Sequence, residues 1–187
     1  MDRNLREEYD RILNSGLDDI VAGNPSLRVG VSESVDSWDI PSGDRIALAR
    51  WGLPVMGRNQ KSVHFKPDPQ SSIEPELSWG CGLGYRLGSY HYREVGASVN
   101  DGMVVGVPQE RRHPYPFLWL NGSVASFIQI AWRWSLALPI FSSLEKAGEA
   151  EQLMDSLYRF PEYARSEDPK IGQDERFQWW NEIADNW

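Results

Sequence analysis

A glycine-rich run, Gly80-Cys81-Gly82-Leu83-Gly84, is the segment closest to a known chemical motif. Such a run binds phosphate when it opens a helix, because the free N–H groups of the first turn then face the anion. Here Tyr85 stands where the dinucleotide motif requires its third glycine, and no Gly-Lys-Ser or Gly-Lys-Thr follows. Residues 85–88 are instead typical of a strand. We therefore interpret the run as a turn that enters a sheet.

The histidines and the single cysteine are the side chains that would bind a metal ion or act as nucleophiles: His64, His91, His113 and Cys81. Their spacing matches no recognised zinc pattern. A reactive cysteine also needs a base placed beside it, which the sequence does not indicate. A Gly-x-Ser-x-Gly nucleophile motif is missing as well. The sequence therefore predicts no catalytic residue, no metal and no cofactor, and a protein that is not an enzyme.

Carboxylates are plentiful, and several are adjacent in the sequence, as at Asp18 and Asp19. Neighbours on a helix point about 100° apart, so they rarely share a proton as catalytic pairs do. One basic and aromatic cluster, Arg111-Arg112-His113 with Tyr115 and Phe117, has a composition suited to nucleic acid. The net charge of −8 argues against it, because phosphate binding needs an excess of Lys and Arg. We expect no direct contact with nucleic acid.

The negative charge is concentrated at the two ends of the chain. Residues 1–40 carry nine acids and four bases, whereas residues 41–140 carry seven acids and ten bases. Residues 141–187 carry eleven acids and five bases. An ordinary solvated surface accounts for this distribution. The alternative is an acidic surface that docks on a cationic partner, where complementary charge raises the association rate and selects the partner.

Length and composition indicate one domain, 1–187, because 187 residues fit a single domain and 22 aromatic residues can supply its core. The N-terminal residues lack the apolar region of a signal peptide. The longest apolar stretch, 126–141, is interrupted by polar residues and a proline, so no membrane span is expected. A lone cysteine excludes an intramolecular disulfide. We expect a soluble protein of the reducing cytoplasm.

The N-terminal third is expected to hold two helices and a short strand. Apolar residues at helical spacing predict a first helix that Gly16 ends, and they are Leu5, Tyr9, Ile12 and Leu13. Alternation over 27–31 predicts a strand, and 34–39 reads as a loop. A second helix is expected over 44–51, with Ser42 as its cap.

The middle of the chain alternates with a period near two, which predicts strands. Residues 95–99 and 103–107 flank Asn100-Asp101-Gly102, the pattern of a β-hairpin. A strand over 117–120 then leads into a helix that Ser123 caps and Pro139 ends.

Two further helices are expected near the C-terminus. The first covers 144–158, and its predicted inward residues are Leu153, Met154, Leu157 and Tyr158. The second starts near Asp174, and its apolar face comprises Phe177, Trp180, Ala184 and Trp187, with Trp179 at the edge of that face. Helices at both ends and strands between them predict an α+β fold, a mostly antiparallel central sheet covered by N- and C-terminal helices.

Several short motifs also follow one another in a fixed order along residues 40–187. They are ALARWGLP at 47–54, YRLG at 85–88, a hairpin with Gly102 in its turn, LWLNGSVASF at 118–127, Asp168-Pro169, and FQWW at 177–180. This order resembles the SUKH superfamily, in particular its fourth immunity-protein family. In that family a helix ends in a Gly-Leu-Pro turn, and a polar cap precedes a helix that bears a Phe.

The resemblance implies a SUKH-like α+β fold without catalytic residues. It also implies a role as a cytoplasmic immunity protein in bacteria that make polymorphic or contact-dependent toxins. Each such protein binds its cognate toxin, often a nuclease or a deaminase, and blocks it. The residues that the resemblance assigns to the fold are Trp51, Gly52, Pro54, Leu87, Gly88, Asn121, Ser123, Phe127 and Trp180. Asn121 or Ser123 is expected to cap the helix that follows.

A stretch of acidic residues with one aromatic anchor, in loop-like sequence, is the predicted toxin contact: Asp18, Asp19, Glu33, Asp36, Trp38 and Asp39. Its carboxylates would stand in for phosphates in a cationic cleft. Residues 1–40 either pack on the core or form a variable addition. Two other functions stay open. One is a ligand-binding or enzymatic domain using the 80–84 turn with His91 or His113, and the other is a general interaction adaptor, since a fold does not fix a function.

Overall fold

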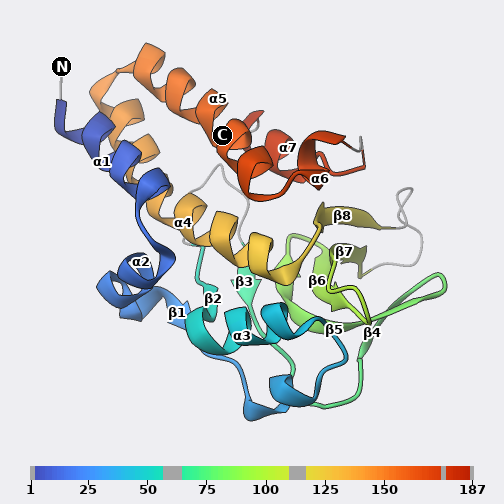
Figure 1. The fold of residues 1–187 in the computed structure, drawn as a ribbon. Coiled ribbons are helices and arrows are strands. Elements are labelled where there is room, and N and C mark those ends of the chain that lie inside the picture. The colour runs from blue at the N-terminus through green and yellow to red at the C-terminus, as the bar shows by residue number, and fades with distance from the viewer. Residues whose placement is uncertain (1–2, 57–64, 110–116, 174–175, 186–187) are drawn as a thin grey trace.

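The computed structural model describes residues 3–56, 65–109, 117–173 and 176–185. Within these residues the chain forms a six-stranded antiparallel sheet and a separate two-stranded pair, with helices packed on one side of the larger sheet (Figure 1). Helix α4 (Val124–Ala147) lies at the centre of the helices, and α1, α3 and α5 each pack on it. The predicted α+β fold with a mostly antiparallel sheet is confirmed.

The strands are short apart from β5. In chain order they are β1 (Arg28–Val29), β2 (Leu53–Pro54), β3 (Phe65–Pro67), β4 (Leu77–Trp79), β5 (Gly82–Tyr90), β6 (Arg93–Ser98), β7 (Val104–Pro108) and β8 (Leu118–Asn121). The large sheet has the order β3-β5-β6-β7-β8, and β4 pairs with the first part of β5. Strand β8 is therefore the last strand at one edge of this sheet.

The helices precede, follow and flank the sheet. They are α1 (Arg3–Asn14), α2 (Leu17–Gly23), α3 (Ser42–Trp51), α4, α5 (Ala150–Glu167), α6 (Lys170–Gln173) and α7 (Trp179–Asp185), together with the 3₁₀ turns η1 (Pro25–Leu27) and η2 (Glu33–Ser37). Turn η2 occupies most of the stretch expected to be a loop, and Pro41 rather than Ser42 is the N-cap of α3. The last helix, α7, begins at Trp179 rather than near Asp174, so Phe177 precedes it, while Asp174 and Trp187 themselves lie outside the described residues.

The predicted hairpin is confirmed as the β6–β7 pair, in which Ala97 faces Val104. Asn100 and Gly102 both have a positive φ in the connecting turn, at 73° and 65°. Position 102 requires glycine because a Cβ there would collide with the carboxylate of Asp44. The hairpin turn is thus fitted against the first turn of α3.

Pro139 does not end the helix that contains it, contrary to the sequence prediction. Helix α4 runs on to Ala147, and Pro139 is exposed on its outer side. A proline inside a helix costs about 3 kcal/mol. The turns beyond it bury Ile140, Phe141 and Leu144 in the core, and this burial outweighs the cost.

The longer α4 shifts the start of the next helix to Ala150, so its inward face also differs from the prediction. Met154 and Tyr158 are 44% and 64% exposed, whereas Leu157 and Phe160 are buried. The prediction was wrong for Met154 and Tyr158. It started this helix at residue 144, six residues before its true start, and so assigned the wrong side of the helix to the core.

Helix α1 joins the same core through contacts with α5, far along the sequence. The Tyr9 hydroxyl donates a hydrogen bond to the backbone carbonyl of Ser156 at 2.8 Å, and Arg159 pairs with Asp10 at 2.6 Å. Further along, Val35 and Trp38 belong to the same buried cluster as the central helix. Residues from the 1–40 segment therefore pack on the core.

The two faces of the large sheet are covered differently. One face packs against α4 and carries the main core, with Leu87 and Val95 fully buried. The other face carries a small separate cluster, Leu77, Trp79, Val105 and Val107, flanked by Phe117 and Trp119. Among the described helices, α4 is long and apolar enough to cross a membrane, but 72% of that stretch is buried inside the protein. Its composition thus fits a central core helix.

Candidate functional site

The carboxylate of Asp168 is the centre of a buried hydrogen-bond network where β8 meets α4. Its Oδ2 accepts from the backbone N–H of Gly122 at 2.6 Å, from Nδ2 of Asn121 at 3.0 Å and from the Ser126 hydroxyl at 2.9 Å. Trp180 donates its indole N–H to Oδ1 of Asn121 at 2.9 Å. The network joins β8, α4, the α5–α6 junction and α7.

The first turn of α4 receives two further acceptors. Ser123 is the N-cap, and its hydroxyl accepts from the N–H of Ser126 at 3.1 Å, so the predicted cap is Ser123 rather than Asn121. Asp44 reaches the same turn from α3, with Oδ1 accepting from the N–H of Ala125 at 2.8 Å. Burial raises the pKa of Asp44 above its ordinary value, and the hydrogen bonds from α4 partly offset that rise.

The remaining residues assigned to the fold by resemblance occupy tight or buried positions. Gly52 ends α3 with a φ of 62°, where a Cβ would lie 2.5 Å from the carbonyl oxygen of Val29. Phe127 packs edge-on against Phe65 at 5.3 Å between ring centroids. Pro54, Leu87, Gly88 and Trp180 are buried as well. Trp51 is half-buried, and its indole N–H donates to Asp18 at 2.8 Å.

The six predicted toxin contacts do not form one continuous patch. Asp18 and Asp19 lie on α2, where Arg50 at the end of α3 binds Asp18 through two hydrogen bonds of 2.6 and 2.8 Å. The hydrogen bond from Trp51 and the contact with Arg50 lower the pKa of Asp18. Glu33, Asp36 and Asp39 are exposed near the start of α3. These two groups of acids lie near opposite ends of α3, which has ten residues and is about 15 Å long.

Trp38 is not an exposed aromatic anchor, and this part of the prediction was wrong. Its side chain is 1% exposed and stacks on Tyr85 at 4.6 Å between ring centroids. Its indole N–H donates to the carbonyl oxygen of Ser72 at 3.0 Å. The sequence around Trp38 is short and polar, so its periodicity does not indicate burial. The prediction also treated this stretch as a loop, whereas it forms the 3₁₀ turn η2, whose C-cap is Trp38.

The glycine-rich run enters the sheet as the sequence predicted, with Gly80 and Cys81 in the turn after β4 and Gly82 to Gly84 at the start of β5. A Cβ at Gly84 would lie 2.5 Å from the carbonyl oxygen of Ala97 and 3.0 Å from the ring of Trp79, so this glycine makes room for the indole. Cys81 and His91 are exposed, while His64 and His113 lie outside the described residues. Among the described residues, no cluster of three or more His, Cys, Asp or Glu is arranged to hold a metal ion.

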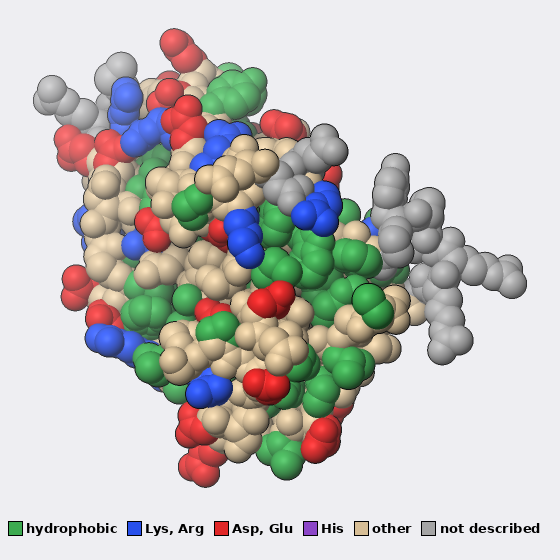
Figure 2. Space-filling model, turned by 45° about the vertical axis from the view of Figure 1, so that its right-hand side comes forward, with side chains coloured by type: hydrophobic (Ala, Val, Ile, Leu, Met, Phe, Trp, Pro, Cys, Tyr) green, Lys and Arg blue, Asp and Glu red, His purple; other side chains and the backbone are tan. Residues whose placement is uncertain are grey.

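Two hollows lie on either side of Trp119 at the edge strand β8. The first, about 280 Å³, extends along Phe117 and Leu118 to α7. The second, about 370 Å³, lies beside Met103 and α6. Trp119 and Arg176 line both hollows, so we call the pair of hollows the β8 groove. Figure 2 shows hydrophobic side chains gathered on this side of the molecule, bordered by Lys or Arg and by Asp or Glu side chains.

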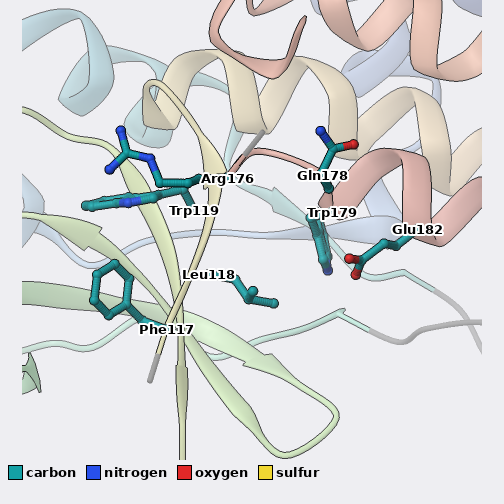
Figure 3. A pocket seen from close by; sticks show the side chains of 7 residues that line it. All are labelled: Phe117, Leu118, Trp119, Arg176, Gln178, Trp179 and Glu182. Atoms are coloured by element: carbon teal, nitrogen blue, oxygen red, sulfur yellow. The ribbon is translucent and has the colours of Figure 1, made fainter. Parts of the chain in front are cut away.

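The side chains of the groove project from both sides of β8. Figure 3 shows Phe117 and Trp119 on one side of the strand and Leu118 on the other, where Trp179 and Glu182 of α7 face it. Trp119 also stacks on Phe177 at 6.3 Å and meets the edge of Phe117 at 5.4 Å. The sequence predicted Phe117 and Trp119 to lie in a strand and did not predict a groove beside them. The groove was missed because α7, which forms its second wall, is 60 residues away in the sequence.

The fold and its buried network define an α+β protein in which motif residues such as Asn121, Ser123 and Trp180 hold the scaffold together. The chain belongs to the SUKH-4 immunity protein family, because a model of that family matches residues 13–186, nearly the whole chain. The resemblance seen in the sequence is therefore confirmed, and the family indicates a toxin-neutralising function. Significant matches were found neither among curated proteins nor among solved structures.

Proposed function

We propose that this protein is a non-enzymatic immunity protein that binds one cognate bacterial toxin in the cytoplasm and blocks it. The family match over residues 13–186 is the observation that carries the proposal. The buried network supports it, because the polar groups of Asn121, Ser123 and Trp180 form hydrogen bonds within the fold. These motif residues thus serve the scaffold, and the exposed surface is left for the toxin.

The acidic residues near the start of α3 support a toxin with a cationic cleft, of the nuclease or deaminase class. Glu33, Asp36 and Asp39 are exposed, and Asp19 lies exposed on α2. The backbone of Asp39 is fixed to the sheet, since its N–H donates to the Tyr85 hydroxyl at 2.9 Å and its carbonyl accepts from Asn100 at 2.7 Å. Asp18 contributes less to this surface, because Arg50 already binds it.

Co-expression with the toxin domain encoded by the neighbouring gene tests the proposal. Growth should be restored when the immunity protein is present, and the two purified proteins should form a complex. Failure of both rescue and complex formation would reject that toxin as the partner.

Charge at the interface is tested separately by measuring the affinity as the salt concentration rises. Screening should weaken the complex if acidic side chains contact a cationic cleft. The double variant Glu33→Lys with Asp36→Lys should weaken it further at low salt. Glu162→Lys, an exposed acid on α5, is the matched control and should leave the affinity unchanged. An affinity independent of salt and of these variants would reject charge mimicry and leave neutralisation itself standing.

A further inference from the structure

The β8 groove lies over the free edge of a sheet. Successive residues of a strand point to opposite faces, yet Phe117, Leu118 and Trp119 all line the same hollow. A hollow on one face would be lined by alternate residues only, so this one must lie over the edge of the strand. Among the described residues, β8 pairs with β7 on one side and with no strand on the other.

An exposed strand edge presents backbone N–H and C=O groups that another extended chain can pair with. The groove supplies walls for the side chains of such a chain. Phe117 and Trp119 form one wall, and Leu118 with Trp179 forms the other (Figure 3). An added strand would therefore direct alternate side chains to the two walls, and each wall offers apolar or aromatic side chains.

The charge around the groove is opposite in sign to that of the whole chain. Lys170 and Arg176 line the hollow beside α6, and Arg176 and Glu182 line the hollow beside α7. Among the described residues that line it, two cations against one anion make the groove locally positive in a chain of net charge −8. Complementary charge selects the partner at such a site. A carboxylate on the incoming segment would meet Arg176 and Lys170 next to Trp119.

We propose that an extended segment of the toxin adds as a strand to the edge of β8, with apolar side chains in the two hollows and a carboxylate beside Arg176 and Lys170. This inference rests on the proposed function, and it gives the toxin a second contact of opposite charge to the acidic surface. Trp119 is the central side chain of this contact, because it lines both hollows.

Hydrogen–deuterium exchange tests the strand addition directly. The probe is the purified C-terminal domain of the toxin encoded by the neighbouring gene, made inactive by substitution of its own catalytic residue. In the complex, exchange should slow by at least about tenfold at those backbone amides of residues 117–119 that point away from β7, because hydrogen bonding to an added strand protects them. Toxin that binds while these amides exchange at an unchanged rate would overturn the inference and leave the proposed function intact. Toxin that does not bind at all would overturn both.

Substitutions test the walls and the charge. Trp119→Ala should weaken the complex by about tenfold or more, as expected for a central aromatic contact. Arg176→Glu should also weaken it, and this variant keeps the test decisive if Trp119→Ala fails to fold. Lys146→Glu is the matched control, since Lys146 is exposed at the far end of α4, about 33 Å along the helix. Equal affinities for Arg176→Glu and the control would overturn the charge assignment.

A single-stranded oligonucleotide serves as the competing probe, because cations beside aromatic rings also suit nucleic acid. The oligonucleotide alone should leave exchange at residues 117–119 unchanged. Protection by the oligonucleotide without toxin would overturn the assignment of a protein segment to the groove.

Discussion

The two ends of strand β8 differ in how completely their polar groups are satisfied. At Asn121 the strand enters a buried network in which the Asp168 carboxylate accepts four hydrogen bonds, three of them at Oδ2, and Trp180 adds a hydrogen bond to Asn121. Two residues earlier, at Trp119, the same strand borders two open hollows. The closed end fixes the strand in the fold, and that rigidity lets the open end present a defined edge to a partner.

The largest expected effect comes from breaking the closed end with Asp168→Ala. This change leaves the donors of Asn121, Gly122 and Ser126 without their acceptor in a buried site, and each unpaired group costs about 1–3 kcal/mol. The free energy of unfolding should fall by at least about 3 kcal/mol in urea titrations. Glu167→Ala, at the exposed neighbouring position, should change it little. Comparable values for the two variants would show that the network does not hold β8.

A smaller effect is expected from Ser123→Ala, which removes one cap and keeps the Asp168 network. The variant should lose about 1 kcal/mol of unfolding free energy, the usual cost of an N-cap hydroxyl. Ser143→Ala, exposed near the other end of α4, is the control for a change of the same chemistry. A loss as large as that of Asp168→Ala would mean that the cap and the network act as one unit.

Asp44→Asn should alter how stability depends on pH. Burial raises the pKa of Asp44 in the folded protein above its ordinary value of 3.8, so ionising this group opposes folding as pH rises through that raised pKa. Asparagine keeps an acceptor for Ala125 and cannot ionise. The stability of the variant relative to the native protein should therefore increase from acidic to neutral pH. Urea titrations over a pH series measure this difference, with the exposed Asp36→Asn as control. Parallel curves would contradict the assignment.

The smallest effect on stability is expected at the open end. Arg176 is exposed, and exposed substitutions away from buried features usually change the free energy of unfolding by about 0.5 kcal/mol or less. Arg176→Glu should therefore keep the native melting temperature within a few degrees while it weakens toxin binding. A large loss of stability would mean that the groove is part of the scaffold, and the contrast between the two ends of β8 would disappear.

Much of the fold could be predicted from local patterns, since period-two alternation and Asn100-Asp101-Gly102 mark the β6–β7 hairpin correctly. The course of α4 through Pro139 could not, because tertiary burial of Phe141 and its neighbours outweighs a local helix-breaking signal. The buried network was visible in part, as separate motifs that included Asn121 and Asp168. The sequence shows that these motifs follow one another along the chain. Only the folded chain shows that the Asp168 carboxylate accepts hydrogen bonds from Asn121 and Ser126.

The predicted binding residues were only partly placed correctly, because composition shows the type of a side chain and not its contacts. Composition identified Glu33, Asp36 and Asp39 as acidic, and the structure leaves them exposed. Composition could not reveal that Trp38 turns inward to stack on Tyr85, or that Arg50 binds Asp18. The β8 groove was beyond prediction, because its two walls come from strand and helix segments that meet only after folding.

The contacts between α1 and α5 have a consequence for the order in which the chain folds. Tyr9 and Asp10 bind Ser156 and Arg159, about 150 positions later in the sequence. During synthesis, α1 leaves the ribosome long before its partners α4 and α5 exist, so its apolar face stays uncovered until both helices have emerged. Such distant pairings slow folding and lengthen the time during which apolar surface is exposed. Completion of the core therefore depends on synthesis of the last fifth of the chain, and truncations within α5 should weaken the docking of α1 by removing its contacts with Ser156 and Arg159.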